Sequence, residues 1–299
     1  MLDCLIVGGG PAGLTAAIYL RRNNLEVLVL EKGIPGGAIV NTASVQNYPG
    51  YENIDGPNLA SNMYSQALSL KAKVKRETAL EIIKEEHYFT VKTNKNIYEA
   101  KNVILALGLE HRKLGLLKEE KFSGKGVSWC AICDGYLYKD KEVCVVGGGN
   151  SSLEESLYLA NICKKVHIVH RRDEFRADKS LVDKVKETDN IVLHLNSNVI
   201  EILGENEFEG VKLSHNNGTE SDLICSALFE FIGYEPKTAF LQNLNICNEY
   251  GFIEVDKEFM TKHEGLYAVG DCINKKVRQI ATAVGDAAYA STIISTKVR

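Results

Sequence analysis

The chain has 299 residues, of which 45% are hydrophobic and 25% are charged, and its formal net charge is −4. This composition is typical of a globular protein with room for two domains, and a slightly acidic chain is not expected to bind nucleic acid. No apolar run approaches the roughly 20 residues of a membrane-spanning helix, and the N-terminus shows no leader signature. We therefore expect a cytoplasmic protein that does not associate with a membrane.

The first predicted unit is a βαβ motif at residues 2–32, LDCLIVGGGPAGLTAAIYLRRNNLEVLVLEK. A strand, a glycine-rich turn, an amphipathic helix and a second strand form the context that the dinucleotide fingerprint requires. Gly8 allows the tight turn, Gly10 lets the backbone approach a pyrophosphate, and Gly13 lets the helix lie close to the strand. The pyrophosphate would lie at the helix N-terminus, where free N–H groups favour negative charge.

Glu31 ends the second strand of this unit. A carboxylate there accepts hydrogen bonds from the ribose hydroxyls of an unphosphorylated adenosine. The unit is therefore predicted to hold FAD or NAD. A polar hairpin and an apolar strand that ends at Gly108 follow it.

Cys130 and Cys133 lie in the stretch SWCAICDGYL, directly before Asp134. Residues three apart on a helical turn share a face, and a modest adjustment brings them to disulfide geometry. Ser128 is predicted to cap this turn, which would leave free N–H groups to stabilise a thiolate. From the spacing alone the pair is a redox disulfide, two small core residues or half of a metal site. A zinc ribbon would need further ligands, and none stands at a suitable spacing.

The other cysteines stand singly in apolar surroundings. In a reducing compartment such cysteines are usually inert core residues, and we predict that role for Cys4, Cys144, Cys163, Cys225, Cys247 and Cys272.

A second βαβ motif covers residues 141–172, KEVCVVGGGNSSLEESLYLANICKKVHIVHRR. Gly147 and Gly149 repeat the fingerprint, and Ser152 takes its third position, where a small side chain preserves close packing. The second strand ends in HRRDEFR, where the first motif has a carboxylate. Cationic donors suit a 2′-phosphate, which predicts NADPH here, although such a cluster is also typical of a solvated helix start. The cationic residues are His170, Arg171, Arg172 and Arg176.

The second motif is followed by a hairpin at Asn216-Asn217-Gly218 and an apolar strand that ends at Gly233. The remaining segment is too short for a third domain. It contains another buried strand, which ends at Gly270-Asp271, and a helix predicted from about Val277 to Ile294.

We therefore predict an α/β fold of two Rossmann-like, three-layer (ββα) nucleotide-binding domains, the second inserted into the first. Residues 1–113 and 244–299 form the predicted FAD-binding domain. Residues 114–243 form the predicted NADPH-binding domain, which carries the CxxC pair.

These motifs together resemble the low-molecular-weight thioredoxin reductases, within the pyridine nucleotide-disulfide oxidoreductases. The resemblance covers essentially the whole chain, through VGGGPAGLTAA, PGG, NYPG, CAICDG, GGGNSSLEES, HRRDEFRA, FIGYEP, GLYAVGD and RQIATAVGDAA. The CxxC-D just before the second nucleotide motif is the most diagnostic feature, because the related lipoamide and glutathione reductases carry their cysteines in the first domain. Three positions depart from the family pattern, namely Ala38, Leu107 and Ser152.

The resemblance implies an NADPH-dependent thioredoxin-disulfide reductase that works as a homodimer, with a large rotation of one domain against the other. Cys133 would take electrons from the flavin, Cys130 would attack the disulfide of thioredoxin, and Asp134 would act as the acid/base. From its sequence alone Asp134 is also compatible with an Asp-Gly turn, and Asp271 with a helix cap.

The resemblance also supplies the cofactor contacts. FAD is expected at Gly8, Gly10, Pro11, Ala12, Gly13, Glu31, Gly36, Gly37, Asn47, Gly108, Gly270, Asp271, Arg278, Gln279, Ile280 and Ala281. NADPH is expected at Gly147, Gly149, Asn150, Ser151, His170, Arg171, Arg172 and Arg176.

Two alternatives remain open from the sequence. The same core could serve another dithiol partner, such as a peroxiredoxin-type protein or a small-molecule dithiol, or another donor, such as ferredoxin. A non-catalytic flavin or nucleotide sensor is the alternative from a different class of protein, although a sensor would not need a CxxC pair.

Overall fold

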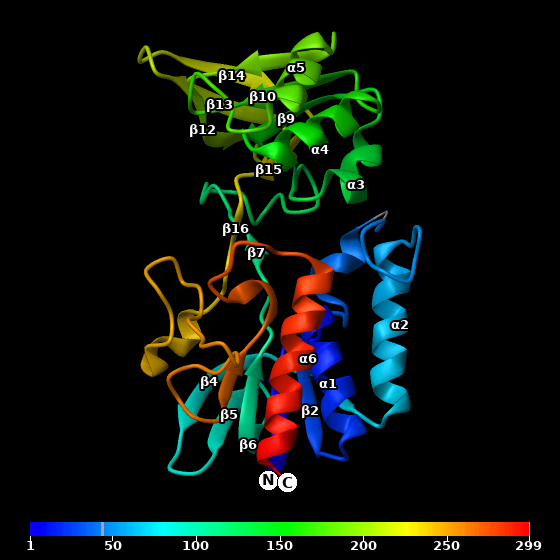
Figure 1. The fold of residues 1–299 in the computed structure, drawn as a ribbon. Helices are drawn as coiled ribbons and strands as arrows, with labels where there is room; N and C mark the ends of the chain where they lie inside the picture. The colour runs from blue at the N-terminus through cyan, green and yellow to red at the C-terminus, as the bar shows by residue number, and fades with distance from the viewer. Residues whose placement is uncertain (43–44, 299) are drawn as a thin grey trace. The chain divides into compact units, whose positions relative to one another are not determined.

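The computed structural model describes residues 1–42 and 45–298. The chain forms two compact units, Met1–Glu110 with Glu235–Arg299, and His111–Tyr234. The colours of Figure 1 show that the first unit holds both ends of the chain, so the second unit is an insertion. The chain passes between the units at β7 (Glu110–His111) and at β16 (Tyr234–Glu235). The sequence placed these boundaries at 113/114 and 243/244.

The first unit is built on a seven-stranded sheet, in the order β3-β2-β1-β6-β5-β4 with β17 paired to β6. β1 pairs in parallel with β2 and β6, and β17 also runs parallel to β6. β4, β5 and β6 are antiparallel neighbours and include the predicted hairpin. The bounds are β1 Leu2–Val7, β2 Val27–Glu31, β3 Lys73–Arg76, β4 Ala79–Lys84, β5 Phe89–Thr93, β6 Ile97–Leu105 and β17 Leu266–Ala268.

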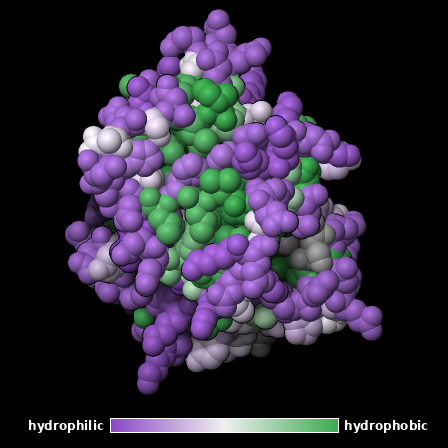
Figure 2. All heavy atoms as spheres, turned by 90° about the horizontal axis from the view of Figure 1, so that it is seen from above, coloured by the Kyte–Doolittle hydropathy of each residue, from purple (hydrophilic) through white to green (hydrophobic). Residues whose placement is uncertain are grey.

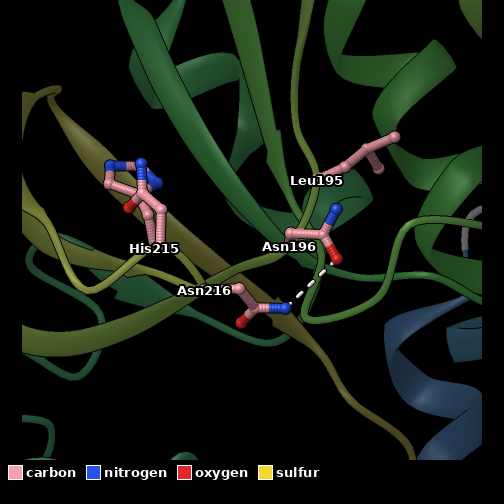
Figure 3. A pocket seen from close by; sticks show the side chains of 5 residues that line it. Leu195, Asn196, His215 and Asn216 are labelled. Carbon is pink, nitrogen blue, oxygen red and sulfur yellow. Dashed lines mark hydrogen bonds between the residues drawn. The ribbon is translucent and has the colours of Figure 1, made fainter.

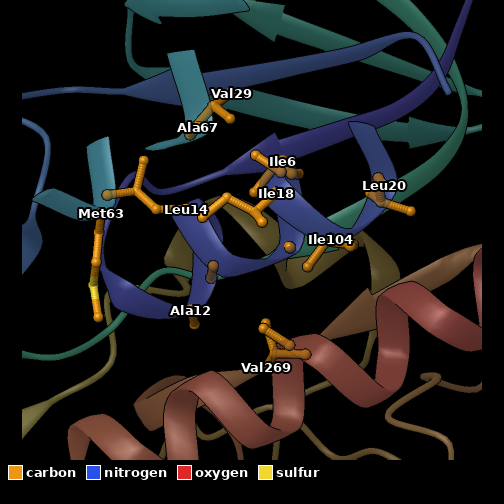
Figure 4. Close-up of a cluster of buried hydrophobic side chains, with 14 of the residues drawn as sticks. Ile6, Ala12, Leu14, Ile18, Leu20, Val29, Met63, Ala67, Ile104 and Val269 are labelled. Atoms are coloured by element: carbon orange, nitrogen blue, oxygen red, sulfur yellow. The ribbon is translucent and has the colours of Figure 1, made fainter. Parts of the chain in front are cut away.

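Alternation along β1 gives this unit its layers. Cys4 and Ile6 belong to the hydrophobic core on the helical side, and Leu5 belongs to the core on the other side. The side chains drawn in Figure 4, among them Ile6 and Leu14, fill the helical side of the sheet. Because successive residues of a strand point to opposite faces, one apolar strand serves both cores. The helices are α1 (Pro11–Arg22), α2 (Gly56–Ser69) and α6 (Ile280–Lys297).

The second unit repeats this plan with a five-stranded parallel sheet, in the order β11-β10-β9-β15-β8. One face packs against α3, α4 and α5, and the other packs against the antiparallel strands β12, β13 and β14. The strands are β8 Val127–Ser128, β9 Glu142–Gly147, β10 Lys165–Val169, β11 Ile191–His194, β12 Ser197–Leu203, β13 Gly210–His215, β14 Glu220–Ile224 and β15 Ala227–Phe231. The helices are α3 Ala131–Asp134, α4 Asn150–Ala160 and α5 Lys179–Glu187.

The predicted fold class is confirmed, and both βαβ motifs and both hairpins form where the sequence indicated. The C-terminal helix begins three residues later than predicted, at Ile280 rather than Val277. Its start is set by a capping box, in which the Gln279 side chain accepts a hydrogen bond from the Thr282 N–H and the Thr282 hydroxyl accepts one from the Gln279 N–H.

Figure 2 shows hydrophilic side chains over most of the face that it draws, with hydrophobic side chains gathered in smaller patches. Among the described residues, none of the helices has both the length and the apolar character needed to cross a membrane.

Candidate active site

The cysteine pair lies at the start of α3. Cys130 and Cys133 form a disulfide, with an S–S distance of 2.06 Å and Cα atoms 5.3 Å apart. Cys130 is the N-cap of this short helix, and its Sγ accepts a hydrogen bond from the Cys133 N–H at 3.2 Å. The prediction that Ser128 caps the turn is wrong. Ser128 ends β8, where it pairs with Phe229, so it lies in an extended strand before the helix begins.

Ser128 has a different role, which the sequence did not indicate. Its Oγ accepts a hydrogen bond from the Cys130 N–H at 3.1 Å and donates one to Asp134 Oδ2 at 2.7 Å. The Ser128 side chain is buried. One hydroxyl therefore fixes the Asp134 carboxylate against the turn that holds the disulfide.

Glu155 is a second carboxyl next to this turn, and sequence reasoning missed it. It belongs to α4, and its carboxylate receives a hydrogen bond from the Ala131 backbone. Its Oε2 is buried and has no hydrogen-bond partner among the described residues. Burial, assisted by the charge of Glu154, raises the pKa of the Glu155 carboxyl. The sequence signal for Glu155 is its position on the helix that follows the second fingerprint.

The first fingerprint turn is closed so tightly that side chains would not fit. Gly8 has φ +107°, and a Cβ there would lie 2.2 Å from Ala106 O. A Cβ on Gly13 would lie 1.8 Å from Gly8 O. The Gly36 N–H donates to Gly9 O at 2.8 Å, which places the Gly36-Gly37 loop against the same turn. Because no side chain covers this turn, a pyrophosphate can approach its backbone closely. The helix α1 begins directly after the turn, with Pro11 and Ala12 as its first residues.

Glu31 is held in place from both sides. Its Oε2 accepts a hydrogen bond from the Gly9 N–H and its Oε1 accepts one from the Gly33 N–H, both at 2.7 Å. Each carboxylate oxygen retains a further lone pair. These can accept hydrogen bonds from ribose hydroxyls, as predicted for an adenosine without a 2′-phosphate.

Asp271 supplies the strongest sign that this unit holds a ligand. It lies in the short 3-10 helix Gly270–Cys272, just after β17, and its Oδ1 is buried with no hydrogen-bond partner among the described residues. Burial raises the pKa of the Asp271 carboxyl. A buried acceptor of this kind requires a donor, and a hydroxyl of a ribityl chain would provide one. The residues present therefore fit FAD.

The loop before α6 completes this end of the unit. Arg278 donates through Nε to Asp271 O at 3.2 Å, and its guanidinium lies 4.5 Å from the centre of the Phe252 ring. Asn47 donates to Gln279 Oε1 at 3.1 Å. Gln279 is the N-cap, so Ile280 and Ala281 are the first residues of the helix and present free N–H groups.

The second unit contains a cavity of about 560 Å³ over its own fingerprint turn. Ser152 is fully buried against Gly147, in keeping with the small residue that the fingerprint needs there. Among the residues expected to bind NADPH, only Arg172 does not line this cavity. The lining residues from that set are Gly147, Gly149, Asn150, Ser151, His170, Arg171 and Arg176, and residues that the sequence did not indicate include His111, Arg112, Ser197, Asn198 and Tyr234.

Two contacts hold the ring of His170 in place at this cavity. Its ring stacks on Phe175 with centroids 5.3 Å apart, and its Nε2 lies 3.0 Å from Glu174 O, to which it donates. Burial and the neighbouring arginines lower the pKa of His170. In the absence of a bound phosphate, the positive charge at this cavity therefore comes mainly from Arg171 and Arg176.

Gly149 offers a direct test of pyrophosphate binding. Its φ of −101° suits any residue, and a Cβ there would meet no protein atom within 4 Å. We expect Gly149→Ala to fold with an unchanged melting temperature but to bind NADPH at least about 10-fold more weakly, because the methyl group occupies the space of the approaching phosphates. Calorimetric titration with NADPH measures this.

Gly147→Ala is the contrasting variant. Gly147 has φ +156°, and its Cβ would lie 2.5 Å from Phe231 O, so this change should lower the melting temperature itself. Unchanged NADPH affinity in Gly149→Ala would show that the phosphates do not approach this turn.

A second hollow of about 620 Å³ lies among Leu195, Asn196, His215, Asn216 and Asn217. Figure 3 shows Asn216 reaching toward Asn196, with Nδ2 donating to Oδ1 at 3.2 Å. The hollow holds none of the predicted site residues.

Comparison with known proteins agrees with this geometry. The model of the pyridine nucleotide-disulphide oxidoreductase family matches residues 2–287. The thioredoxin reductase of Mycoplasma genitalium is 43% identical over 95% of this chain and 91% of its own, and that of Bacillus subtilis is 42% identical over 97% and 92%. The crystal structure of the Lactococcus lactis thioredoxin reductase superposes with a TM-score of 0.90 at 36% identity, covering 100% of this chain and 99% of that one.

Proposed function

Because the chain belongs to the pyridine nucleotide-disulphide oxidoreductase family, we infer that it is a thioredoxin-disulfide reductase, which passes electrons from NADPH through FAD and a cysteine pair to thioredoxin. The observation that carries this conclusion is the disulfide between Cys130 and Cys133, in a chain with two nucleotide-binding units. FAD, when bound, supplies a two-electron carrier between NADPH and the cysteines. Asp271, Glu31 and the Gly8–Gly13 turn would hold it, as the unpartnered Oδ1 of Asp271 supports.

The chain's own residues account for the thiol chemistry. In the reduced pair, the Cys130 thiolate attacks one sulfur of the thioredoxin disulfide, so that a mixed disulfide forms and a thioredoxin thiolate leaves. The Cys133 thiolate then attacks Cys130 Sγ, which restores the internal disulfide and releases the second thioredoxin sulfur. Two electrons pass to thioredoxin, and each leaving thiolate takes up a proton.

The contacts of the turn support the remaining roles that we propose. The Cys133 N–H points at Cys130 Sγ, and such a donor stabilises a thiolate relative to a thiol. Ser128 holds the Asp134 carboxyl at the turn, where it can deliver a proton to a departing thiolate. Asp134 is therefore the proposed general acid.

The test is an anaerobic titration of the flavin absorbance, followed by turnover assays. NADPH should bleach the flavin, and added thioredoxin should restore it while becoming reduced. Glutathione disulfide and a small dithiol substrate serve as parallel arms. A flavin that NADPH does not bleach would refute the assignment, and faster turnover with a small disulfide would identify a different partner.

We also propose that the enzyme is a cytoplasmic homodimer. The homodimer is the state that the family resemblance implies, and sedimentation of the flavin-loaded protein tests it. A reducing location is supported by the cysteines outside the redox pair. None of those that the structure describes forms a disulfide, and all except Cys247 are buried.

A further inference from the structure

Two glutamates are buried in the second unit, and neither lines the nucleotide cavity. Glu230 is 1% exposed and Glu119 is 3% exposed. Glu230 stands in β15, a strand whose other residues are apolar, and alternation places it on the same face as Leu228, toward the core that includes Val127 and Cys144. Ionised glutamates are rarely buried to this extent without a cationic partner, so their protons must be accounted for.

The hydrogen bonds of Glu119 and Glu230 involve only one oxygen of each carboxyl. Glu119 Oε2 accepts from the Gly115 N–H at 2.7 Å and from the Leu116 N–H at 2.9 Å. Glu230 Oε2 accepts from Trp129 Nε1 at 2.9 Å and from the Leu114 N–H at 3.3 Å.

The second oxygens, Glu119 Oε1 and Glu230 Oε1, are buried and have no donor among the described residues. The two carboxyls are neighbours that can hydrogen-bond to each other when one is protonated. When each of two neighbouring carboxyls has an oxygen that lacks a donor, one shared proton can satisfy both.

The pair is connected directly to the redox segment. Trp129, whose indole N–H donates a hydrogen bond to Glu230, is the residue before Cys130. Leu114, whose N–H ends on the same oxygen, lines the cavity over the second fingerprint. Glu230 therefore contacts both the backbone of the nucleotide cavity and the side chain next to the attacking cysteine.

We propose that Glu119 and Glu230 share one proton, and that this proton, acting through the Trp129 indole, positions the segment that carries Cys130. The inference rests on the proposed function only in assigning a role to Cys130. While the proton is present, the two carboxyls carry one negative charge and hold the indole by a fixed contact. Its loss places two like charges together in the core, which the structure can relieve only by moving a carboxyl.

The shared proton is expected to be lost within the physiological pH range. Burial, together with the charge of Glu119, raises the pKa of Glu230 to about 7. Other charged groups surround the pair. Lys113 lies 5.2 Å from the centre of the Trp129 ring and is ion-paired with Glu120. Asp134 lies beyond Ser128.

Two cysteines, Cys144 and Cys225, belong to the same core. Burial raises the pKa of Cys144 well above its ordinary value and that of Cys225 to about 12. Both thiols therefore stay protonated through neutral pH and do not titrate with the pair.

Trp129 is the only tryptophan of the chain, so tryptophan emission reports on the surroundings of this one side chain. In the oxidised, flavin-loaded enzyme without substrate, tryptophan emission should change with a midpoint near pH 7. In Glu230→Gln the amide keeps the acceptor for Trp129 and gives a donor to Glu119, so the contacts remain and the transition should vanish. Persistence of the transition in this variant would overturn the proposal.

Glu119→Gln provides a second, independent variant. It removes the like charge and donates to Glu230, so the emission midpoint should move down by about one pH unit or more. Glu220→Gln is the matched control, because Glu220 is an exposed glutamate of β14, and the midpoint should stay in place. A midpoint that does not move in Glu119→Gln would also overturn the proposal.

The link to Cys130 is tested by the pH profile of thioredoxin reduction at saturating NADPH. The wild-type profile should show an inflection near pH 7 that Glu230→Gln lacks. A lost emission transition with an unchanged profile would show that the proton does not reach the cysteines, which refutes the positioning role. Because emission is measured without substrate, failure of the proposed function and failure of this inference give different results.

Discussion

Replacing Cys133 by Ser is expected to abolish reduction of thioredoxin, with kcat falling by about 10³-fold or more. The hydroxyl of serine can neither form the internal disulfide nor resolve a mixed one at neutral pH. Cys130→Ser should lose activity to the same extent. Both variants should fold and bind NADPH, because neither sulfur lines the nucleotide cavity. NADPH-dependent turnover with thioredoxin measures the loss.

The two variants differ in what they trap. Cys133→Ser leaves the attacking Cys130 without its resolving partner, so a mixed disulfide with thioredoxin should accumulate on non-reducing gels. Cys130→Ser should not accumulate it, and the reverse pattern would exchange the two roles. Cys247→Ser is the control, because Cys247 is an unpaired cysteine of the other unit and is the least buried of that group.

Replacing both Arg171 and Arg176 by Ala should remove the preference for NADPH. Each arginine that contacts a phosphate through charge-assisted hydrogen bonds contributes about 1.5–3 kcal/mol, which corresponds to about 10- to 100-fold in affinity. We expect kcat/KM for NADPH to fall by at least about 10²-fold in the double variant. With NADH, which lacks the 2′-phosphate, kcat/KM should change little. Steady-state kinetics with both nucleotides measure this.

Arg172 provides the matched control for this experiment. It belongs to the same basic stretch but does not line the cavity, so Arg172→Ala should lose much less activity with NADPH. Equal losses for all three arginines would mean that the cluster acts as a diffuse positive field rather than through direct contacts. Equal losses with NADH would mean that the arginines support the fold of the loop.

Local patterns made the two βαβ motifs predictable. Glycine spacing, a helical apolar face and β-branched strands all lie within about 30 residues, so the places of Gly8, Glu31 and Gly147 in their motifs follow from the sequence alone. α2 carries start signals of the same local kind, because Asp55 caps it and Pro57 stands in its first turn.

Long-range pairings could not be predicted in the same way. Glu230 is the one charged residue of the apolar stretch SALFEFIG, and its contact with Trp129 depends on the pairing of β15 with β8, which no local pattern reveals. The sequence favours Ser128 as the helix cap because serine is a common cap. In the structure the sheet extends through Ser128, so its hydroxyl donates a hydrogen bond to Asp134 instead.

The buried cysteines outside the redox pair are protected from thiol–disulfide exchange. Burial raises the pKa of Cys163 and of Cys272 to about 11, so almost no thiolate forms on either at neutral pH. An enzyme that exchanges disulfides could form wrong disulfides among its own cysteines, but these two thiols are buried and stay protonated. Burial thereby keeps them out of the exchange that takes place at Cys130 and Cys133.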